Sequence, residues 1–241
     1  MIEPEDIYRQ CYESRQERAE FLWRLYLSRH AEGQPISADT YLDIGVGNLA
    51  NATLFGRRTA ARDAVGIDVR DDLSSSRDIA VVRADVRALP FCDRSFGLIT
   101  MFSLMEHVPQ PSTYLVEVLR VLRKEGELFI QLPNRYFPIE LHSGLFMHFY
   151  LPKQVRNWLA NGAGRSWMKD IEIPRPSEVR RILKRLDPSR DVVTFGFLYP
   201  ASLLPKSRII RELYRFLKGL NIFRLLPMGH CILVRACRNN S

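Results

Sequence analysis

Short apolar runs alternate with helical segments through the first half of the chain, and this alternation is the feature that most restricts the fold. The segments over 49–58 and 111–123 carry apolar residues at helical spacing, whereas the runs between them have the length of buried strands. Parallel neighbours in a sheet need crossovers of this kind. The sequence therefore predicts an α/β protein with a doubly wound, mostly parallel sheet. Its strands are expected over 40–44, 64–69, 79–84, 96–102 and 127–132.

The rest of the chain predicts additions to this sheet. An amphipathic helix over about 5–30 precedes the first strand. Residues 133–175 are rich in proline, glycine and aromatic residues and interrupt the alternation, which is typical of a lid or substrate-binding wall. Further helices and strands are expected over 177–186, 192–197, 207–220 and 231–236. A length of 241 residues favours a single domain over 1–241, with the first helix as an N-terminal cap.

Composition excludes several classes of protein. Apolar residues make up 46% of the chain and charged residues 26%, as in soluble globular proteins and unlike disordered or fibrous ones. No apolar run reaches the roughly 18 residues that a membrane-spanning helix needs, and the acidic start lacks the pattern of a secretory signal. The four cysteines show no C-x-x-C spacing. We therefore expect reduced thiols and a cytoplasmic location.

The turn after the first strand is the candidate ligand site, because ligands of doubly wound sheets bind beyond the carboxyl ends of the strands. The chain reads LDIGVGNLA from Leu42, and Gly45 and Gly47 allow the backbone to approach a ligand closely. Asp43 lies two residues before Gly45. Its charge would repel a pyrophosphate and attract an ammonium or sulfonium group. The turn therefore favours a cationic ligand.

Two further acids follow the neighbouring strands. Asp68 ends the second strand, 23 residues after Gly45, where a carboxylate can accept hydrogen bonds from both hydroxyls of a ribose. Asp85 follows the third strand, where a carboxylate can accept a hydrogen bond from an adenine amino group. The three acids together indicate a nucleoside that carries a positive charge.

A series of short motifs runs from Tyr41 to Asn134: LDIGVG (42–47), GID (66–68), ADV (84–86), LPF (89–91), DRSFGLI (93–99), LMEHV (104–108), LRVLRKEGEL (119–128) and PN (133–134). With these motifs the segment resembles the class I S-adenosylmethionine-dependent methyltransferases, in particular the small-molecule, type 11-like group whose first motif reads D-x-G-x-G. The resemblance implies a Rossmann-like sheet of seven strands with a reversed last strand, which 231–236 would supply, and S-adenosylmethionine as cofactor.

The resemblance also assigns residues to parts of the cofactor. It implies that Asp43, Gly45 and Gly47 hold the amino-acid end, that Asp68 holds the ribose, that Asp85 and the Val86 N–H hold the adenine, and that Phe102 forms a wall. The neighbouring residues Val46, Asn48 and Val69 are also expected to bind the cofactor. One position departs from the family pattern, because Leu49 stands where a third glycine is common. We expect Asn48 to adopt the left-handed conformation there, with binding retained in a reshaped loop.

The acceptor needs a general base only if the atom to be methylated carries a proton. The candidate bases are His107, which follows the fourth strand, and Glu140, His142 and His148 in the 133–175 segment. No metal site is expected, because Glu106, His107, His142 and His148 lack the ligand spacing of one. The acceptor chemistry is therefore predicted to depend on one of these side chains or on none.

The positive charge of the chain is concentrated near its end. Residues 175–241 carry 14 basic and 4 acidic side chains, and 207–224 interleave arginines with apolar residues as interfacial helices do. This composition predicts peripheral contact of 207–224 with an anionic membrane. Nucleic acid is not expected as a partner, because a basic face supplies only non-specific attraction.

Together these patterns predict an enzyme that transfers a methyl group from S-adenosylmethionine to a small molecule. A hydroxyl or carboxyl oxygen is favoured as the acceptor atom, and saccharides, natural products and lipid-linked sugars are the candidate acceptors. Two alternatives stay open. An NAD(P)-dependent oxidoreductase uses a similar glycine turn, although Asp43 and Asp85 argue against it. A non-catalytic binding module of the same fold would account for Leu49.

Overall fold

The structure of the protein is a computed structural model that describes residues 15–30, 38–71, 76–137, 151–162, 171–203 and 226–237, together with 212, 214–216 and 219. Several predicted features lie wholly or partly outside these residues. They are the first part of the 5–30 helix, most of the 133–175 segment with Glu140, His142 and His148, and most of 207–224.

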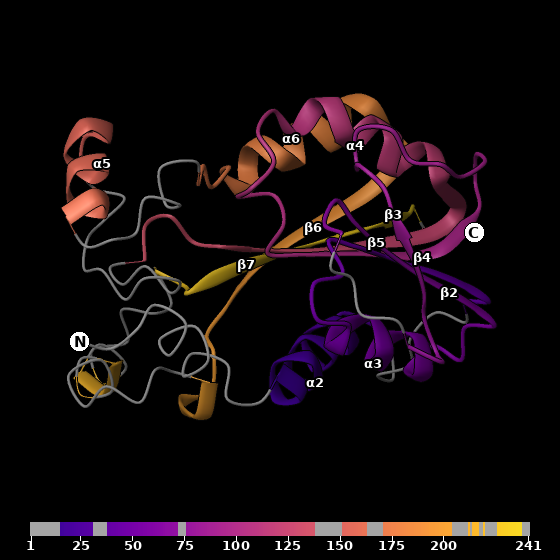
Figure 1. Cartoon of the computed structure of the whole chain (residues 1–241), viewed down its shortest axis with the longest axis horizontal. Coiled ribbons are helices and arrows are strands. Elements are labelled where there is room, and N and C mark those ends of the chain that lie inside the picture. The colour runs from indigo at the N-terminus through magenta and orange to yellow at the C-terminus, as the bar shows by residue number, and fades with distance from the viewer. Residues whose placement is uncertain are drawn as a thin grey trace.

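One seven-stranded sheet forms the centre of the molecule, with the strand order β3-β2-β1-β4-β5-β7-β6 (Figure 1). Strands β1 to β5 pair in parallel, and β7 runs antiparallel to both of its neighbours, β5 and β6. The doubly wound sheet with a reversed last strand is thus confirmed. The strands are β1 (Thr40–Ile44), β2 (Asp63–Asp68), β3 (Ala80–Arg83), β4 (Phe96–Phe102), β5 (Leu122–Pro133), β6 (Arg190–Phe197) and β7 (Gly229–Ala236).

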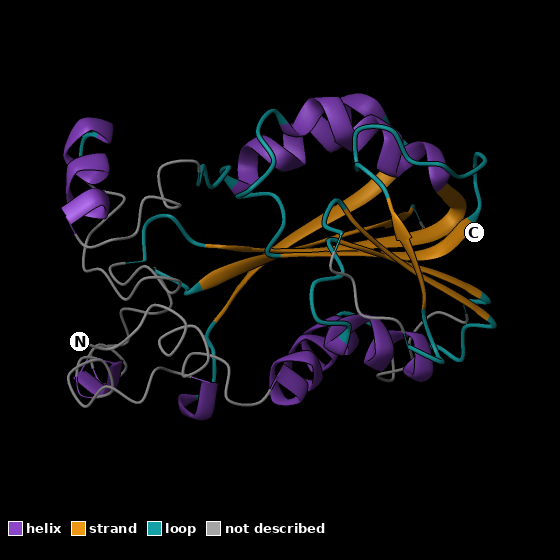
Figure 2. Ribbon diagram, in the orientation of Figure 1, coloured by secondary structure: helices purple, strands orange, loops and turns teal. Residues whose placement is uncertain are grey.

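Helices α2 (Arg15–Leu27) and α3 (Ala50–Arg58) cover one face of the sheet (Figure 2). Aromatic side chains fill the space between the helices and the strands. The Trp23 and Phe55 rings meet edge to face with centroids 5.1 Å apart, and Phe55 also contacts Phe102 of β4 at 5.2 Å. Burial of such rings contributes more to stability than any other side-chain type, so α2 is an integral part of the core.

Helices α4 (Pro111–Val121) and α6 (Pro176–Leu186) cover the opposite face (Figure 2). Each has a proline in its first turn, where the missing N–H costs no hydrogen bond. The apolar stripe predicted over 111–123 faces the sheet, since Tyr114, Leu115 and Val118 are buried. The two faces therefore hold separate cores, as expected of a three-layer α/β protein.

The remaining described elements are helix α5 (Lys153–Gly162) and a short 3-10 turn, η4 (Ala201–Leu203). Helix α5 falls in the 133–175 segment, for which the sequence predicted no regular element. Among the described residues, none of the helices has the length and the apolar character that crossing a bilayer requires.

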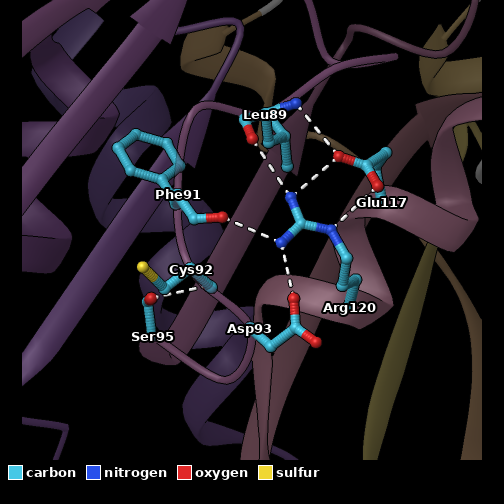
Figure 3. A network of polar contacts seen from close by, with 7 residues as sticks. All are labelled: Leu89, Phe91, Cys92, Asp93, Ser95, Glu117 and Arg120. Carbon is cyan, nitrogen blue, oxygen red and sulfur yellow. Dashed lines mark hydrogen bonds and ion pairs between the residues drawn. The ribbon is translucent and has the colours of Figure 1, made fainter.

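Arg120 of α4 fixes the loop that follows β3 (Figure 3). Its guanidinium donates to the carbonyl oxygens of Leu89 and Phe91 at 3.1 and 2.8 Å. It also donates to the carboxylates of Asp93 at 2.8 Å and Glu117 at 2.9 Å. Arginine suits this role, because its planar fork presents five donors in fixed directions. The loop between β3 and β4, which contains Asp85, is thus tied to a core helix.

A buried ion pair ties the turn that follows α2 to the middle of β5. His30 Nε2 lies 2.8 Å from Glu127 Oε2, and His30 Nδ1 lies 2.9 Å from the Tyr26 carbonyl oxygen. The Tyr26 hydroxyl donates to the same Glu127 oxygen at 2.7 Å. Both ring nitrogens of His30 face acceptors, and only a doubly protonated imidazole donates from both. The geometry therefore favours the charged form of His30.

We expect this ion pair to make stability fall at alkaline pH. Burial alone would lower the pKa of His30, but the hydrogen bond to Glu127 and its negative charge outweigh burial, so the pKa lies above its usual value. The pair is therefore fully stabilising below about pH 6.5, the usual pKa of histidine, and is lost as pH rises through the higher pKa of the folded state. In urea unfolding, the free energy of unfolding of the wild type should exceed that of His30→Gln at pH 6, and this difference should decrease by about 1–3 kcal/mol between pH 6 and 9. A constant difference across that range would contradict the assignment.

Candidate functional site

A cleft of about 550 Å³ lies at the carboxyl ends of β1 to β4. Strand β1 has β2 on one side and β4 on the other, so the cleft lies where the strand order reverses. The structure brings together there nearly all of the residues that the sequence assigned to the cofactor, with one candidate base. The predicted residues that line the cleft are Gly45, Val46, Gly47, Asn48, Asp68, Val69, Asp85, Val86, Phe102 and His107.

The glycine turn forms one wall of the cleft. Gly45 and Gly47 have positive φ angles of 78° and 54°, which glycine adopts without strain. A Cβ atom on Gly45 would lie 2.9 Å from Leu104 Cδ1, so a larger residue would require the Leu104 side chain to move. The N–H groups of Gly45 and Val46 both donate to the Ile67 carbonyl at 2.9 Å. These bonds fix the turn against the end of β2.

The prediction that Asn48 adopts the left-handed conformation is wrong. The left-handed conformation falls on Leu49, with φ 68° and ψ −7°, and Asn48 is not among the residues with positive φ. Asn48 instead accepts a hydrogen bond from the Ala50 N–H at 3.1 Å. The Leu49 side chain is buried and packs in the core, and this burial offsets the roughly 1–2 kcal/mol that a left-handed leucine costs.

Asp43 lies behind the cleft wall and not at its surface. Its side chain is buried, and its Oδ1 accepts a hydrogen bond from Thr100 Oγ1 at 2.6 Å. The Tyr41 hydroxyl lies 2.7 Å from the same Thr100 oxygen. Burial raises the pKa of Asp43 to about 7, although Thr100 and the positive charge of Arg18 act in the opposite direction. A cation in the cleft would therefore be attracted by the charge of Asp43 without contacting its carboxylate.

Asp68, at the end of β2, is held by the backbone and by an arginine. Its carboxylate accepts hydrogen bonds from the Gly47 N–H at 3.2 Å and from Arg70 Nε and Nη2 at 3.2 and 3.1 Å. Burial alone would raise the pKa of Asp68, but these donors outweigh it and lower the pKa below its usual value. Arg70 also donates to the Gly47 carbonyl at 3.1 Å, so it spans the glycine turn and β2.

Asp85 repeats this arrangement after β3. The tripeptide Asp-Val-Arg occurs at both 68–70 and 85–87, and Arg87 Nε donates to both carboxylate oxygens of Asp85 at 3.0 and 3.1 Å. The bonds from Arg87 lower the pKa of Asp85. The cleft thus holds two ionised carboxylates, each paired with the second residue after it. The repeated tripeptide is the sequence signal for these pairs, which the prediction did not use.

Arg18 is a cleft residue that sequence reasoning missed. It belongs to α2, which was predicted only as a cap, and its side chain reaches the cleft next to Ser103. Helical periodicity predicts which face of a helix is buried. It does not predict where the charged end of a long side chain lies when its residue stands between the buried and the exposed face. No pattern in the sequence marks this arginine among the others.

The structure places one of the four candidate bases. His107 is exposed and lines the cleft, while Glu140, His142 and His148 lie outside the described residues. Within the described part of the chain, no three histidine, cysteine, aspartate or glutamate side chains cluster as metal ligands do.

The segment that forms most of this cleft is similar to known methyltransferases. Residues 42–130 match a family described as "methyltransferase domain". A mitochondrial ubiquinone biosynthesis O-methyltransferase from Candida albicans is 30% identical over 113 residues, which are 42% of this chain and 34% of the relative. A demethylmenaquinone methyltransferase from Chlamydia trachomatis is 29% identical over 112 residues, 44% of this chain and 49% of the relative. The chain thus spans half or less of the length of these curated relatives.

A solved structure extends the similarity of fold to almost the whole chain. A phosphoethanolamine N-methyltransferase 2 from Haemonchus contortus, in complex with S-adenosyl-L-methionine, superimposes with a TM-score of 0.65 at 10% identity. The match covers 98% of this chain and 58% of the other.

Proposed function

We propose that the chain is a class I, S-adenosylmethionine-dependent enzyme that transfers a methyl group to a small-molecule acceptor, a proposal supported by the match of residues 42–130 to a methyltransferase domain. The observation that carries the proposal is the pair of ionised carboxylates, Asp68 and Asp85, in one cleft with the glycine turn. A nucleoside presents hydroxyl and amino donors at a spacing that two neighbouring strand ends can match.

In this proposal, Asp68 accepts from the ribose hydroxyls, and Asp85 with the Val86 N–H holds the adenine edge. The apolar side chains of Val86, Ala84 and Val108 line the cleft and would give the flat base an apolar surface. Arg70 and Arg87 keep both acids ionised, so that each remains a strong acceptor.

The glycine turn and Phe102 would contact the charged end of the donor, and the negative charge of Asp43 would attract it. The donor supplies the methyl group, which it carries on a sulfonium sulfur. Methyl transfer is an in-line displacement, so the protein contributes by aiming the acceptor and excluding water. Phe102 is buried against Phe55 and Phe129, which makes it a rigid wall. A rigid wall limits the directions from which an acceptor can approach.

We propose a hydroxyl oxygen of a small molecule as the acceptor atom. The name of the Candida albicans relative includes O-methyl transfer, and a protonated oxygen is the case in which a base helps. His107 lines the cleft, and His142, Glu140 and His148 stay predicted alternatives in the segment 133–175, which would cover the acceptor. Contact of 207–224 with an anionic membrane likewise stays a prediction.

Titration calorimetry distinguishes this function from the oxidoreductase alternative. The chain should bind S-adenosylmethionine and S-adenosylhomocysteine, while NAD and NADP should give no heat of binding at the same concentration, because Asp43 and Asp85 disfavour a pyrophosphate in this cleft. Binding of NAD without binding of either sulfur compound would overturn the proposal. Donor binding without turnover on any hydroxyl, carboxyl or amine acceptor would favour a non-catalytic module.

A further inference from the structure

Arg70 holds both carboxylate oxygens of Asp68 with its guanidinium group. Its Nε donates to Oδ1 at 3.2 Å, and its Nη2 donates to Oδ2 at 3.1 Å. Two backbone N–H groups also donate to this carboxylate, that of Arg70 to Oδ1 and that of Gly47 to Oδ2, each at 3.2 Å. A carboxylate has about four lone-pair positions. The bonds that lower the pKa of Asp68 thus also take up its acceptor positions.

The two side-chain bonds of Arg70 are the ones that a ligand can replace. Asp68 and Arg70 both line the cleft. The side chain of Asp68 is 12% exposed, whereas that of Arg70 is 49% exposed. Arg70 can therefore turn into solvent while the backbone N–H groups keep Asp68 in place. Breaking a half-exposed ion pair of this kind costs little free energy.

The guanidinium presents to Asp68 the same number of donors as a ribose does. Nε–H and Nη2–H are neighbouring donors of one planar group, and they reach the two oxygens of one carboxylate. The two hydroxyls of a ribose are neighbouring donors as well, and in the proposed function they donate to this carboxylate. Since the acceptor positions of Asp68 are taken, the guanidinium and the ribose cannot both bond to it.

Arg70 also connects two walls of the cleft. Its Nη2 donates to the Gly47 carbonyl oxygen at 3.1 Å, so the side chain reaches from the end of β2 to the glycine turn. A rotation of this side chain away from Asp68 would break the contact with the turn at the same time. The position of Arg70 therefore determines whether the ribose end of the cleft is accessible.

We propose that Arg70 is an internal competitor of the ribose, and that its side chain must turn away from Asp68 before the two hydroxyls can bind. This inference rests on the proposed function, because it takes Asp68 as the acceptor of the ribose hydroxyls. S-adenosylmethionine and S-adenosylhomocysteine carry the same ribose, so Arg70 weakens the binding of donor and product alike. Return of Arg70 to Asp68 would help the product to leave.

Titration calorimetry on Arg70→Met tests this competition. The variant should bind S-adenosylhomocysteine and methylthioadenosine about 3- to 10-fold more tightly than the wild type, because the competing ion pair is absent. The 2′,3′-dideoxy analogue of methylthioadenosine has neither hydroxyl, so its affinity, measured by competition, should change by less than about twofold. Arg62→Met is the matched control, since Arg62 pairs with Asp63 at the other end of β2 and does not line the cleft.

Salt provides a second measurement of the same competition. S-adenosylhomocysteine has no net charge, so added salt acts mainly on the ion pair. The difference in affinity between the wild type and Arg70→Met should shrink as salt rises from about 0.02 to 0.5 M, since screening weakens the pair. Arg70→Lys keeps the charge but not the planar group, and its affinity should lie between those of the other two proteins. If Arg70→Met does not fold, Arg70→Lys is compared with the wild type, and equal affinities overturn the inference.

Three other results would also overturn it. Weaker binding of the two hydroxyl-bearing ligands by Arg70→Met would show that Arg70 helps to hold the ribose. Equal tightening of all three ligands would show that Arg70 limits access to the cleft without regard to the hydroxyls. Unchanged affinity for all three would show that no competition takes place. Wild-type protein that binds neither S-adenosylhomocysteine nor methylthioadenosine would instead refute the proposed function.

Discussion

Replacing Asp68 by alanine should weaken the binding of S-adenosylhomocysteine by about 100- to 10,000-fold. Two ribose hydroxyls would lose a charged acceptor, and each such hydrogen bond contributes about 1.5–3 kcal/mol, where 1.4 kcal/mol is a factor of ten. The substitution also leaves Arg70, which donates to Asp68 in the structure, facing the ribose without its counter-ion. Calorimetry at fixed ionic strength measures the effect, since a half-exposed pair of this kind is screened by salt.

The same loss should appear with methylthioadenosine, because this ligand keeps the ribose and lacks the amino-acid part. Asp71→Ala is the matched control. Asp71 is an exposed acid three residues away that pairs with Arg83 and does not line the cleft. A variant of Asp68 that binds either ligand as tightly as the wild type does would remove Asp68 from the ribose site.

Replacing Asp43 by asparagine should stabilise the free protein at alkaline pH. The pKa of Asp43 is about 7 in the folded protein and near 4 in an unfolded chain. Between these values the folded state binds the extra proton, so the stability of the wild type falls as pH rises, by about 4 kcal/mol in total. Asparagine carries no such penalty and still accepts the Thr100 hydrogen bond. Urea unfolding at pH 8 should show a gain of about 2–4 kcal/mol for the variant, since the extra buried N–H donors offset part of it.

The gain should vanish below about pH 3, where wild-type Asp43 is protonated in both states. Binding should change in the opposite sense, because only the ionised carboxylate attracts the donor's cation. Wild-type affinity for S-adenosylmethionine should rise from pH 6 to 8 with release of a proton, and Asp43→Asn should bind about 10- to 100-fold more weakly at pH 8. A variant that is less stable than the wild type at pH 8, with unchanged affinity, would show that Asp43 serves packing alone.

The sequence predicts the sheet well because short apolar runs flanked by turns admit few alternatives. Strand β4 has the predicted bounds, and β5 begins at Leu122, where the sequence predicts the end of the preceding helix. There the helix continues directly into the strand, with the register shift between Phe96 and Leu98 at the junction. Single-residue propensity cannot place such a junction, since tertiary pairing decides it.

The candidate site was predictable where backbone geometry defines it. Gly45, Gly47, Asp68 and Asp85 follow strand ends, and strand ends meet at one edge of a parallel sheet. The conformation of Leu49 was not predictable, because core packing overrides the preference of asparagine for the left-handed region. The depth of Asp43 was not predictable either, since a strand position gives the face of a side chain and not its hydrogen-bond partners.

Helix α2 touches the sheet at both of its ends. Arg18 meets Ser103 and Gln131 beside the cleft, and His30 with Tyr26 meets Glu127 at the opposite margin. The segment that matches the methyltransferase domain starts at residue 42, so it does not include α2. The matched segment therefore leaves out a helix whose side chains bond to β5 at two places, to Gln131 and to Glu127, so a chain shortened to that segment would lose both contacts.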